Sequence, residues 1–399
     1  MLRQYQEDSL NFILQRDRTL LADDTGLGKT LICIEAAKRL KLRRVLVICP
    51  AFLRENWRRE VEKWKATHME WDIVSYEGAS KMDPPKGMYD LMICDEAHYL
   101  KNWSANRTKN ILLNIAPRIP KAIFSTATPY MRSAADLHPL FSVCEPGKWG
   151  KFGAFCDRYC LQVPDPYSPR KFRYVGFRKS TVEEVKRASS RFMIRHKKSD
   201  VLTELPEKII SMVPLEVDTS SLEDCNIPPE EVFKLLAAHI EPAGRLSTAM
   251  RAIGLLKVPA VVEWAQNLGE QAVIFAWHRD VLHELSDRLS DTAMLIGDMP
   301  EKERYDVIDD FQAGKTKILL ASIAAAGVGI NLTAARIAAF IELPWNPASI
   351  KQCEDRLHRM GQLNAVNVYR FYAENTIDKY VLSTLSSKIQ GEHLTVGNL

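Results

Sequence analysis

Short apolar runs recur along the chain, and most of them are continuous rather than alternating. A continuous run of about four to eight apolar, β-branched residues is typical of a parallel strand that is buried on both faces. The runs that predict strands are Thr19–Ala22, Val45–Cys49, Leu91–Cys94, Ala122–Phe124, Val273–Ala276, Ile318–Ala321, Ala338–Ile341 and Val366–Tyr372. Segments with helical spacing lie between them, namely Thr30–Leu40, Arg54–Lys65, Val281–Leu289 and Glu301–Phe311. This alternation predicts an α/β fold.

The predicted strands fall into two groups, one before about residue 130 and one after about residue 270. The stretch between them is richer in charge and proline, with helical spacing near 181–194 and 230–256 and a strand-like run at Ile210–Val217. We therefore expect two lobes, each a parallel sheet sandwiched by helices, with helical insertions between them. The expected bounds are 1–215 for the first lobe (with an insertion at about 141–198), 216–255 for a second insertion and linker, and 256–399 for the second lobe.

The segment Leu20–Thr30 joins a predicted strand to a predicted helix through a turn with two glycines. Glycines allow backbone N–H groups to approach phosphate oxygens, and the helix N-terminus adds the positive end of its dipole. Lys29 is then expected to contact the β- and γ-phosphates of a nucleotide, and the Thr30 hydroxyl to ligate Mg²⁺. The usual pattern has a glycine where Asp23 stands, so the strict pattern fails. An ordinary strand-to-helix turn is the alternative.

The segment Tyr89–His98 predicts a buried strand that ends in two adjacent carboxylates, Asp95 and Glu96. We expect Asp95 to hold Mg²⁺ through its water shell, and Glu96 to orient or deprotonate the attacking water. Phosphoryl transfer needs this division, because the metal screens charge while a separate base handles the nucleophile. The pair is more informative than isolated acids because it follows a later strand of the kind that precedes Lys29.

The segment Gln352–Gln362 carries Arg356 and Arg359, which share a face if the segment is helical. Two guanidiniums directed at one point suit the charge that develops on a γ-phosphate. Surface arginines paired with Glu354 and Asp355 are the alternative. The nucleotide loop and the acidic pair lie in the first lobe and these arginines in the second. We therefore expect a composite site that hydrolyses ATP only when the lobes close.

Composition and charge exclude several classes of protein. The chain has 399 residues, of which 46% are hydrophobic and 26% charged, and these are ordinary globular values. No apolar stretch reaches the roughly 18 residues that a membrane helix needs, and the charged N-terminus MLRQYQED is not a secretory signal. The net charge is only +4, yet residues 170–198 carry eleven basic and two acidic side chains. This segment is either a solvated helical face or a surface for an anionic backbone.

Eight cysteines without a CxxC pair fit no disulfide framework, so we expect free thiols in a reducing compartment. A zinc site is the alternative, and its ligands would be His138, Cys144, Cys156 and Cys160. Cys353 is not expected to act as a nucleophile, because no suitable histidine–carboxylate arrangement points to it. Trp57 and Trp64 are expected to pack their helix on a sheet rather than to bind a partner.

Together these motifs resemble the Swi/Snf type of superfamily-two helicase-like motors, over nearly the whole chain. Leu2–Gln6 resembles that family's opening motif, in which the glutamine reads adenine, and an aspartate at the position of Asp23 is normal there. The resemblance implies two RecA-like lobes, ATP and Mg²⁺ as ligands, and DNA-dependent ATP hydrolysis. The residues that it implies for the nucleotide are Gln6, Asp23, Asp24, Thr25, Gly26, Leu27, Gly28, Lys29 and Thr30; for the metal, Thr30 and Asp95; and for catalysis, Lys29, Asp95, Glu96, Gln352, Arg356 and Arg359.

Further segments carry the same resemblance. They are Val47–Leu53 with Asn56 and Trp57, Ser75–Tyr76, Ser125–Pro129, Phe192–Arg195, Ser199–Val201, Glu204–Pro206, Phe275–His278 and Ser322–Thr333. The resemblance implies DNA contacts at Pro50, Ser75, Tyr76, Lys101, Thr126, Trp277 and Asn331. It also favours DNA binding by the basic segment 170–198. The chain departs from the family at Thr25, where methionine is usual, and at Ala324 and Ala326, where many relatives carry a basic residue and a glycine.

The residues of several motifs, among them DEAHYLKN, SIAAAGVG and ELPW, resemble those of the annealing-helicase, fork-remodelling branch of the family. This implies an ATP-driven double-stranded DNA translocase that acts on duplex or forked DNA in repair or replication, away from membranes. Such relatives usually carry recognition modules, whereas this chain ends 37 residues after Gln362. We therefore expect a bare motor whose specificity comes from a protein partner. Its compartment is expected to be the cytoplasm or nucleoid in a prokaryote or virus and the nucleus in a eukaryote.

Three alternative functions remain open at this point. A strand-separating or RNA-directed helicase uses the same motifs. A DNA-binding scaffold with a vestigial ATPase is less favoured, because the lysine, the acidic pair and both arginines are present. A motor subunit of a larger defence or remodelling complex is the third.

Overall fold

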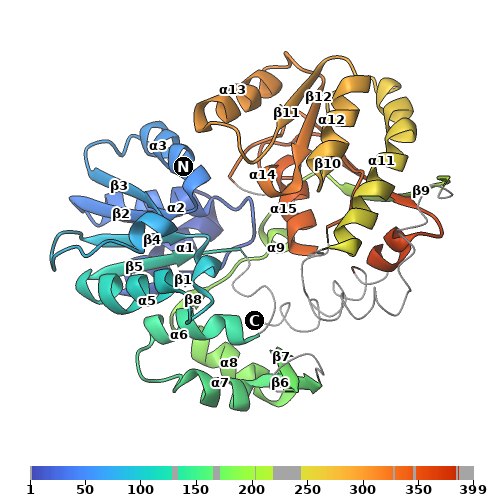
Figure 1. Ribbon diagram of the computed structural model, residues 1–399. Coiled ribbons are helices and arrows are strands. Elements are labelled where there is room, and N and C mark those ends of the chain that lie inside the picture. Colours follow the sequence, from blue (N-terminus) through green and yellow to red (C-terminus); the bar gives the residue numbers. More distant parts are fainter. Residues whose placement is uncertain are drawn as a thin grey trace. The chain divides into compact units, whose positions relative to one another are not determined.

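The computed structural model describes residues 2–127, 134–164, 171–202, 204–218, 244–326, 329–344, 347–382 and 385. These residues form two compact units, and the boundary between the units lies just before Glu204. Each unit contains one six-stranded sheet with helices packed on it (Figure 1). Every pair of neighbouring strands in both sheets is parallel. The α/β fold with two lobes is therefore confirmed.

The first sheet has the strand order β3-β2-β4-β5-β1-β8. Its strands are β1 (Arg18–Leu21), β2 (Arg44–Cys49), β3 (Glu70–Ser75), β4 (Leu91–Asp95), β5 (Lys121–Ser125) and β8 (Met193–Ile194). The helices of this unit's sheet layer are α1 (Gln4–Leu14), α2 (Lys29–Arg39), α3 (Arg54–Lys63), α4 (Tyr76–Ala79) and α5 (Asn106–Lys109). The strands β1, β2, β4 and β5 are almost wholly buried, as their continuous apolar runs predicted. Strand β5 separates β1 from β4, so the loops after these two strands begin on either side of β5.

An insertion lies between β5 and β8. Its elements are α6 (His138–Cys144), α7 (Phe152–Tyr159), β6 (Cys160–Pro164), β7 (Phe172–Phe177) and α8 (Val182–Ser189). Strands β6 and β7 pair as an antiparallel hairpin, which the expectation of a helical insertion missed. Figure 1 shows the hairpin beside α7 and α8. An aromatic cluster of Phe141, Trp149, Phe155, Tyr159 and Phe192 holds the insertion together.

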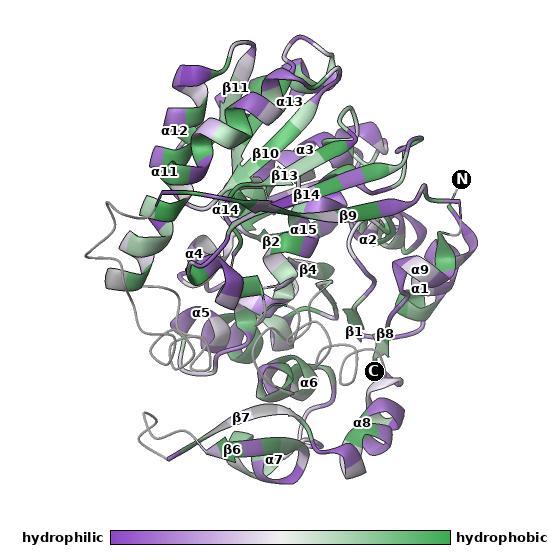
Figure 2. Cartoon of the chain, turned by 90° about the vertical axis from the view of Figure 1, so that its right-hand side faces the viewer, coloured by the Kyte–Doolittle hydropathy of each residue, from purple (hydrophilic) through white to green (hydrophobic). Residues whose placement is uncertain are grey.

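The second sheet has the order β11-β12-β10-β13-β14-β9. Its strands are β9 (Lys208–Leu215), β10 (Ala272–Ala276), β11 (Thr292–Leu295), β12 (Ile318–Ser322), β13 (Ile337–Phe340) and β14 (Val366–Ala373). The helices of the second unit are α11 (Arg245–Gln266), α12 (Arg279–Arg288), α13 (Glu301–Gln312), α14 (Ile323–Ala326) and α15 (Pro347–Leu357), whereas the short helix α9 (Lys198–Val201) belongs to the first unit. Figure 2 shows hydrophobic strands in this sheet and helices that carry both apolar and polar faces. Among the helices of the described residues, none is long and apolar enough to span a bilayer.

The expected end of the first lobe at residue 215 is wrong. Strand β9 pairs in parallel with β14 from Lys208, opposite Val366, to Leu215, opposite Ala373, and so belongs to the second sheet. The sequence cannot reveal this pairing, because the two strands are far apart along the chain. Most of the expected linker, residues 219–243, lies outside the described residues, and α11 begins at Arg245 within the second unit.

Candidate active site

The nucleotide loop connects β1 to α2 at the carboxyl edge of the first sheet. Gly26 and Gly28 both have φ of 80°, and Gly28 is the left-handed residue that begins α2. Only glycine adopts this conformation without strain, which explains both residues. No side chain caps this end of α2 in the described part of the chain. The first N–H groups of the helix are therefore suited to an anion.

Lys29 and Leu27 show how the loop is held. The Lys29 ammonium donates to the carbonyl oxygens of Asp23 at 2.8 Å and Asp24 at 3.1 Å. The Leu27 carbonyl accepts hydrogen bonds from the Tyr5 hydroxyl at 3.2 Å and from Gln6 Nε2 at 3.1 Å. Helix α1 thus fixes the loop through the residue that was predicted to read adenine, and that role of Gln6 stays a prediction. Thr25 is buried, and Thr30 is half-buried at the start of α2.

Asp23 and Asp24 face other protein groups. Asp23 is fully buried, and its carboxylate accepts hydrogen bonds from Ser9 Oγ at 2.9 Å, His196 N at 2.7 Å and His196 Nδ1 at 2.9 Å. Asp24 Oδ2 accepts from the backbone N–H of Lys198 at 3.2 Å. The Asp23 oxygens are therefore occupied by α1 and by the segment after β8, and a nucleotide contact by this residue stays a prediction.

The acidic pair stands at the end of β4. Asp95 Oδ2 accepts a hydrogen bond from Trp57 Nε1 at 3.0 Å, and Oδ1 accepts from Glu96 N at 3.0 Å. Burial and then the charge of Glu96 raise the pKa of Asp95 to about 6, while the charge of Lys29 lowers it. The nucleotide loop and the acidic pair are thus close enough for their charges to interact. Glu96 has φ of 53°, a left-handed conformation that is strained for a residue with a side chain.

His98 links the acidic pair to the next strand of the sheet. Its Nδ1 lies 3.3 Å from Glu96 Oε2 and 3.1 Å from Thr126 Oγ1, at the end of β5. Thr126 has no exposed surface. This contact joins two of the predicted motifs directly. Thr128 and Pro129, which complete the motif of Thr126, lie outside the described residues.

Three of the residues that were predicted to contact DNA offer little side-chain surface, and their DNA contacts stay predictions. Pro50, Tyr76 and Thr126 are buried, because the strand ends that carry them pack against the core. The Tyr76 hydroxyl donates to the Asp95 carbonyl at 2.8 Å, and its ring stacks on Tyr99 at 5.2 Å. The other predicted DNA contacts keep some exposed surface and stay predictions; they are Ser75, Lys101, Trp277 and Asn331.

The predicted arginines lie at the end of α15 in the second unit. The helix ends at Leu357, so Arg356 lies in its last turn and Arg359 beyond it. Their predicted position on one helical face is therefore wrong. Arg359 donates to the Ile330 carbonyl at 3.2 Å, and the Arg356 carbonyl accepts from Leu332 N at 3.0 Å. Both arginines are thus tied to the segment after α14, and Gln352 is half-buried on α15.

Glu354 does not form the surface pair that was the alternative for these arginines. It is buried, and its two oxygens accept from Lys208 of β9 and Arg370 of β14, both at 2.6 Å. Burial opposes its ionisation, but the two cations together lower its pKa. Glu354 therefore fastens α15 to the two outer strands β14 and β9.

The matches to known sequence families settle which kind of protein this geometry belongs to. The chain matches the SNF2-related domain over residues 5–88 and 73–241, and the helicase conserved C-terminal domain over residues 255–361. It belongs to the SNF2 family of helicase-like ATPases. The Swi/Snf resemblance of the motifs is thereby confirmed, and the chain is an ATP hydrolase of the helicase-like type.

Known SNF2 relatives are longer than this chain. It is 30% identical to the DNA annealing helicase and endonuclease ZRANB3 of Bos taurus, over 97% of this chain and 40% of that protein. It is 29% identical to the SWI/SNF-related matrix-associated actin-dependent regulator of chromatin subfamily A-like protein 1 of Xenopus tropicalis, over 98% of this chain and 44% of that protein. The chain therefore spans less than half the length of these relatives.

A solved structure of the same family is also similar. The Sulfolobus solfataricus SWI2/SNF2 ATPase core in complex with dsDNA has 22% sequence identity and a TM-score of 0.45, covering 100% of this chain and 94% of that one. A similarity at this level adds nothing to the assignment, which rests on the sequence families.

The cysteines of this SNF2 chain form no metal site among the described residues. His138, a proposed zinc ligand, instead accepts from Trp103 Nε1 at 2.7 Å and lies 3.0 Å from the Gly150 carbonyl, and burial lowers its pKa. The described cysteines are free and buried. Burial also raises the pKa of Cys353, as expected for a thiol that is not a nucleophile.

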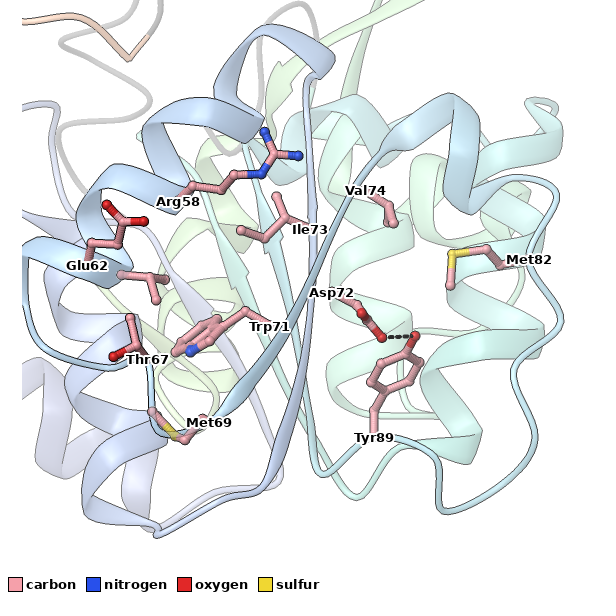
Figure 3. A pocket seen from close by; sticks show the side chains of 11 residues that line it. Arg58, Glu62, Thr67, Met69, Trp71, Asp72, Ile73, Val74, Met82 and Tyr89 are labelled. Carbon is pink, nitrogen blue, oxygen red and sulfur yellow. Dashed lines mark hydrogen bonds between the residues drawn. The ribbon is translucent and has the colours of Figure 1, made fainter.

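A pocket of about 590 Å³ lies around β3, the outermost strand on one side of the first sheet (Figure 3). Trp71 and Ile73 line one side, and Asp72 and Tyr89, joined by a hydrogen bond of 2.8 Å, line the other. None of the predicted site residues lines this pocket. The Trp71 ring lies 6.5 Å from that of Trp57, the residue that holds Asp95.

Sequence reasoning missed the role of Trp57. The helical spacing predicted packing on the sheet, and Trp57 is indeed buried. Its indole N–H, however, is the donor that orients the carboxylate predicted to hold Mg²⁺. A possible signal was its place at the start of the helix that follows β2, next to β4 in the sheet.

Proposed function

We propose that this chain is a DNA-dependent ATPase that translocates along double-stranded DNA without having to separate its strands. The observation that carries the proposal is the geometry of the first unit, in an SNF2-family chain. Lys29 of the glycine loop is close enough to a half-buried acidic pair for their charges to interact, and Asp95 of that pair has a pKa raised to about 6. This is the arrangement that binds a nucleoside triphosphate and activates water.

The residues of the site fit a magnesium ion. A carboxylate oxygen of Asp95 and the hydroxyl of Thr30 are the oxygen ligands that Mg²⁺ prefers. When bound with ATP, the ion would neutralise charge on the phosphate oxygens. Lys29 would exchange the Asp23 and Asp24 carbonyls for phosphate oxygens, and Glu96 would accept the proton of the attacking water.

The second unit is proposed to complete the site. Arg356 and Arg359 supply the positive charge that phosphoryl transfer requires when the units close on ATP. Both arginines are hydrogen-bonded to the segment after α14, and these bonds fix the position of their positive charge within the second unit. Closure with ATP and opening after hydrolysis would then form the mechanical cycle.

The proposed track is the phosphate backbone of duplex DNA. Residues 170–198 carry eleven basic and two acidic side chains, and Lys179 and Arg187 are exposed within them. Such a surface binds through counterion release, independently of base sequence. A finer proposal, fork remodelling by strand annealing, is supported by the annealing helicase among the relatives.

The test is steady-state ATP hydrolysis with no nucleic acid, duplex DNA, single-stranded DNA, forked DNA or RNA. Lys29→Ala serves as the blank. We expect duplex or forked DNA to stimulate turnover and the stimulation to fall steeply as salt rises. Stimulation by RNA alone, or by no nucleic acid, would contradict the proposal, and ATP-driven displacement of a labelled strand would favour a strand-separating helicase.

Charge reversal sharpens the test of the basic surface. Lys179→Glu with Arg187→Glu should raise the DNA concentration that gives half-maximal stimulation, and should leave DNA-free turnover unchanged. The matched control is Lys81→Glu with Lys86→Glu, two exposed lysines of the same unit outside the segment. Equal effects of the two pairs would indicate that only net charge matters.

A further inference from the structure

The segment that follows the insertion runs directly alongside the nucleotide loop. Phe192, Ile194 and His196 place their carbonyls 2.8, 2.8 and 3.0 Å from the backbone N–H groups of Leu20, Ala22 and Asp24. This ladder continues the pairing of β8 with β1 beyond the end of both strands. The backbone of the nucleotide loop is thus partly built from residues after the insertion.

Side chains reinforce the ladder at the point where the loop departs from the usual glycine. The buried Asp23 carboxylate receives both the backbone N–H and the imidazole Nδ1 of His196. It also receives the hydroxyl of Ser9, which places α1 in the same network. The backbone N–H of Lys198 binds Asp24 Oδ2, and Arg195 lies 3.8 Å from Asp24 Oδ1.

The same two aspartates hold the catalytic lysine through their backbone. Their carbonyl oxygens accept the two hydrogen bonds from Lys29 Nζ. His196 is therefore one residue away from the group that is proposed to bind phosphate. Any shift of His196 moves Asp23, and with it an acceptor of the Lys29 ammonium.

The other end of the segment is anchored in the insertion. The Phe192 ring packs in the aromatic cluster, 5.1 Å from Phe141 and 6.2 Å from Trp149. Arg191, immediately before it, binds Glu145 at 2.9 Å. Because the interior of such a cluster is close-packed, a movement of the insertion displaces Phe192 as well.

We propose that Asp23 and His196 form a latch that couples the insertion to the nucleotide loop, with His196 as a positioning residue for ATP turnover. The part of this proposal that concerns the response to DNA rests on the proposed function. Force on the basic insertion is transmitted through Phe192 and the ladder to His196, and from there through Asp23 to Lys29. An aspartate thus stands at the glycine position, at Asp23, where its carboxylate receives this segment.

The charge on the His196 imidazole sets the strength of the latch. Around it lie the Asp23 carboxylate, the Asp8 carboxylate on α1, and the Tyr5 ring at 5.9 Å, with Arg195 and Lys198 in its own segment. The hydrogen bond to Asp23 raises the pKa of His196 against the effect of burial. A raised histidine pKa means that the ion pair is fully present in mild acid and is lost as pH rises through that pKa.

The experiment measures kcat and KM for ATP without DNA, between about pH 6.5 and 8.5, the range in which histidine titrates. The wild type is compared with His196→Arg, which stays charged, and His196→Gln, which stays neutral. We expect the wild-type KM to rise about tenfold with pH, as small displacements of a binding group can produce. His196→Arg should hold the low value and His196→Gln the high value throughout. Thermal unfolding checks that each variant is folded.

Parallel profiles in all three proteins would overturn the positioning role, and so would a His196→Gln profile that still bends. The matched control is His68→Arg, on an exposed histidine of the same unit, which should follow the wild type. If His68→Arg also flattens the profile, added charge alone explains the effect and the latch is refuted.

The coupling is read from the ratio of turnover with duplex DNA to turnover without it. We expect His196→Gln to lower this ratio severalfold relative to the wild type at the same pH, because the charged imidazole contact to Asp23 is then lost and only the backbone contact of His196 remains. An unchanged ratio refutes the coupling. Absence of stimulation in the wild type contradicts the proposed function instead, and the DNA-free profiles still decide the positioning role.

Discussion

A half-buried carboxylate of the first unit and a buried carboxylate of the second unit have opposite electrostatic surroundings. In the first unit, Asp95 accepts hydrogen bonds from two uncharged donors, the Trp57 indole and a backbone N–H, and burial together with the charge of Glu96 raises its pKa to about 6. In the second unit, Glu354 receives two cations, Lys208 and Arg370, and its pKa falls. A carboxylate whose described hydrogen-bond donors are uncharged can take a cation from outside, whereas a carboxylate that is paired with two cations holds elements of the fold together.

The same contrast separates the chemistry of the units. Lys257 and Asp378, another buried pair of the second unit, lie 2.6 Å apart and fix α11 to the segment after β14. In the first unit, the contacts described above join the Lys29 ammonium only to carbonyl oxygens, and Glu96 is held in a strained conformation. The charges of these two side chains can therefore interact with a ligand. The first unit thus keeps charged groups that can bind a charged ligand, whereas the second unit fixes the positions of its arginines.

The largest expected effect tests the acidic pair. Glu96→Gln should lower kcat by at least about a thousandfold, because the proton acceptor is lost, while binding of a fluorescent ATP analogue persists. The control is Glu77→Gln, an exposed glutamate of the same unit. Turnover near the wild-type rate in Glu96→Gln would remove the pair from the reaction.

Replacing Glu354 is instead expected to change the stability of the protein. Glu354→Gln leaves Lys208 and Arg370 without a buried counter-charge, so the free energy of unfolding in urea should fall by about 3 kcal/mol. Glu284→Gln is the comparison, because its pair with Arg288 on α12 is exposed and should change stability by less than about 1 kcal/mol. Similar losses in both variants would contradict the fastening role.

Trp57 tests whether the uncharged donor prepares Asp95 for its ion. Trp57→Phe keeps most of the packing but removes the N–H, so the Mg²⁺ concentration for half-maximal ATPase should rise about tenfold, as expected for a lost second-shell contact. Trp64→Phe is the matched control, because its indole binds Glu60 at 2.7 Å on the same helix, away from the pair. Identical Mg²⁺ curves in the wild type and Trp57→Phe would show that Asp95 needs no such donor.

The smallest expected effect is the change of the Mg²⁺ requirement with pH. Asp95 has a raised pKa of about 6, so it becomes protonated as pH falls through that value, and the proton competes with Mg²⁺. Lowering the pH from about 8 to about 6 should raise the half-maximal Mg²⁺ concentration about twofold, because about half of the Asp95 carboxylates are then protonated. Excess Mg²⁺ should restore turnover, and a loss that Mg²⁺ cannot reverse would point to another group.

Much of the fold could be predicted from the sequence. All eight apolar runs are strands, because strands buried on both faces must be apolar throughout. The edge strands β3 and β11 and the hairpin β6–β7 were missed, since partly exposed strands mix polar and apolar residues and lack a continuous run. Strand β8 was missed because two residues are too short to form a run. Strand β9 was seen but placed in the wrong lobe, because its partner β14 is distant in sequence.

The candidate site was predictable to a different degree in each part. The glycine loop and the acidic pair carry their chemistry in adjacent residues, and the structure brings them together. Some residues that were predicted to contact DNA turned out to be buried at strand ends, as for Tyr76 and Thr126. Exposure depends on packing from elsewhere in the chain, and no local motif records it.

The sequence by itself determined which chemical groups the chain carries and that they stand at strand ends, because motif spacing and apolar runs are local properties. Only the tertiary structure decided their partners: Trp57 on Asp95, His196 on Asp23, and Lys208 with Arg370 on Glu354. Each of these contacts joins residues that are at least 16 positions apart. Their hydrogen bonds and pKa shifts arise only when folding removes the groups from water and places them within reach of each other.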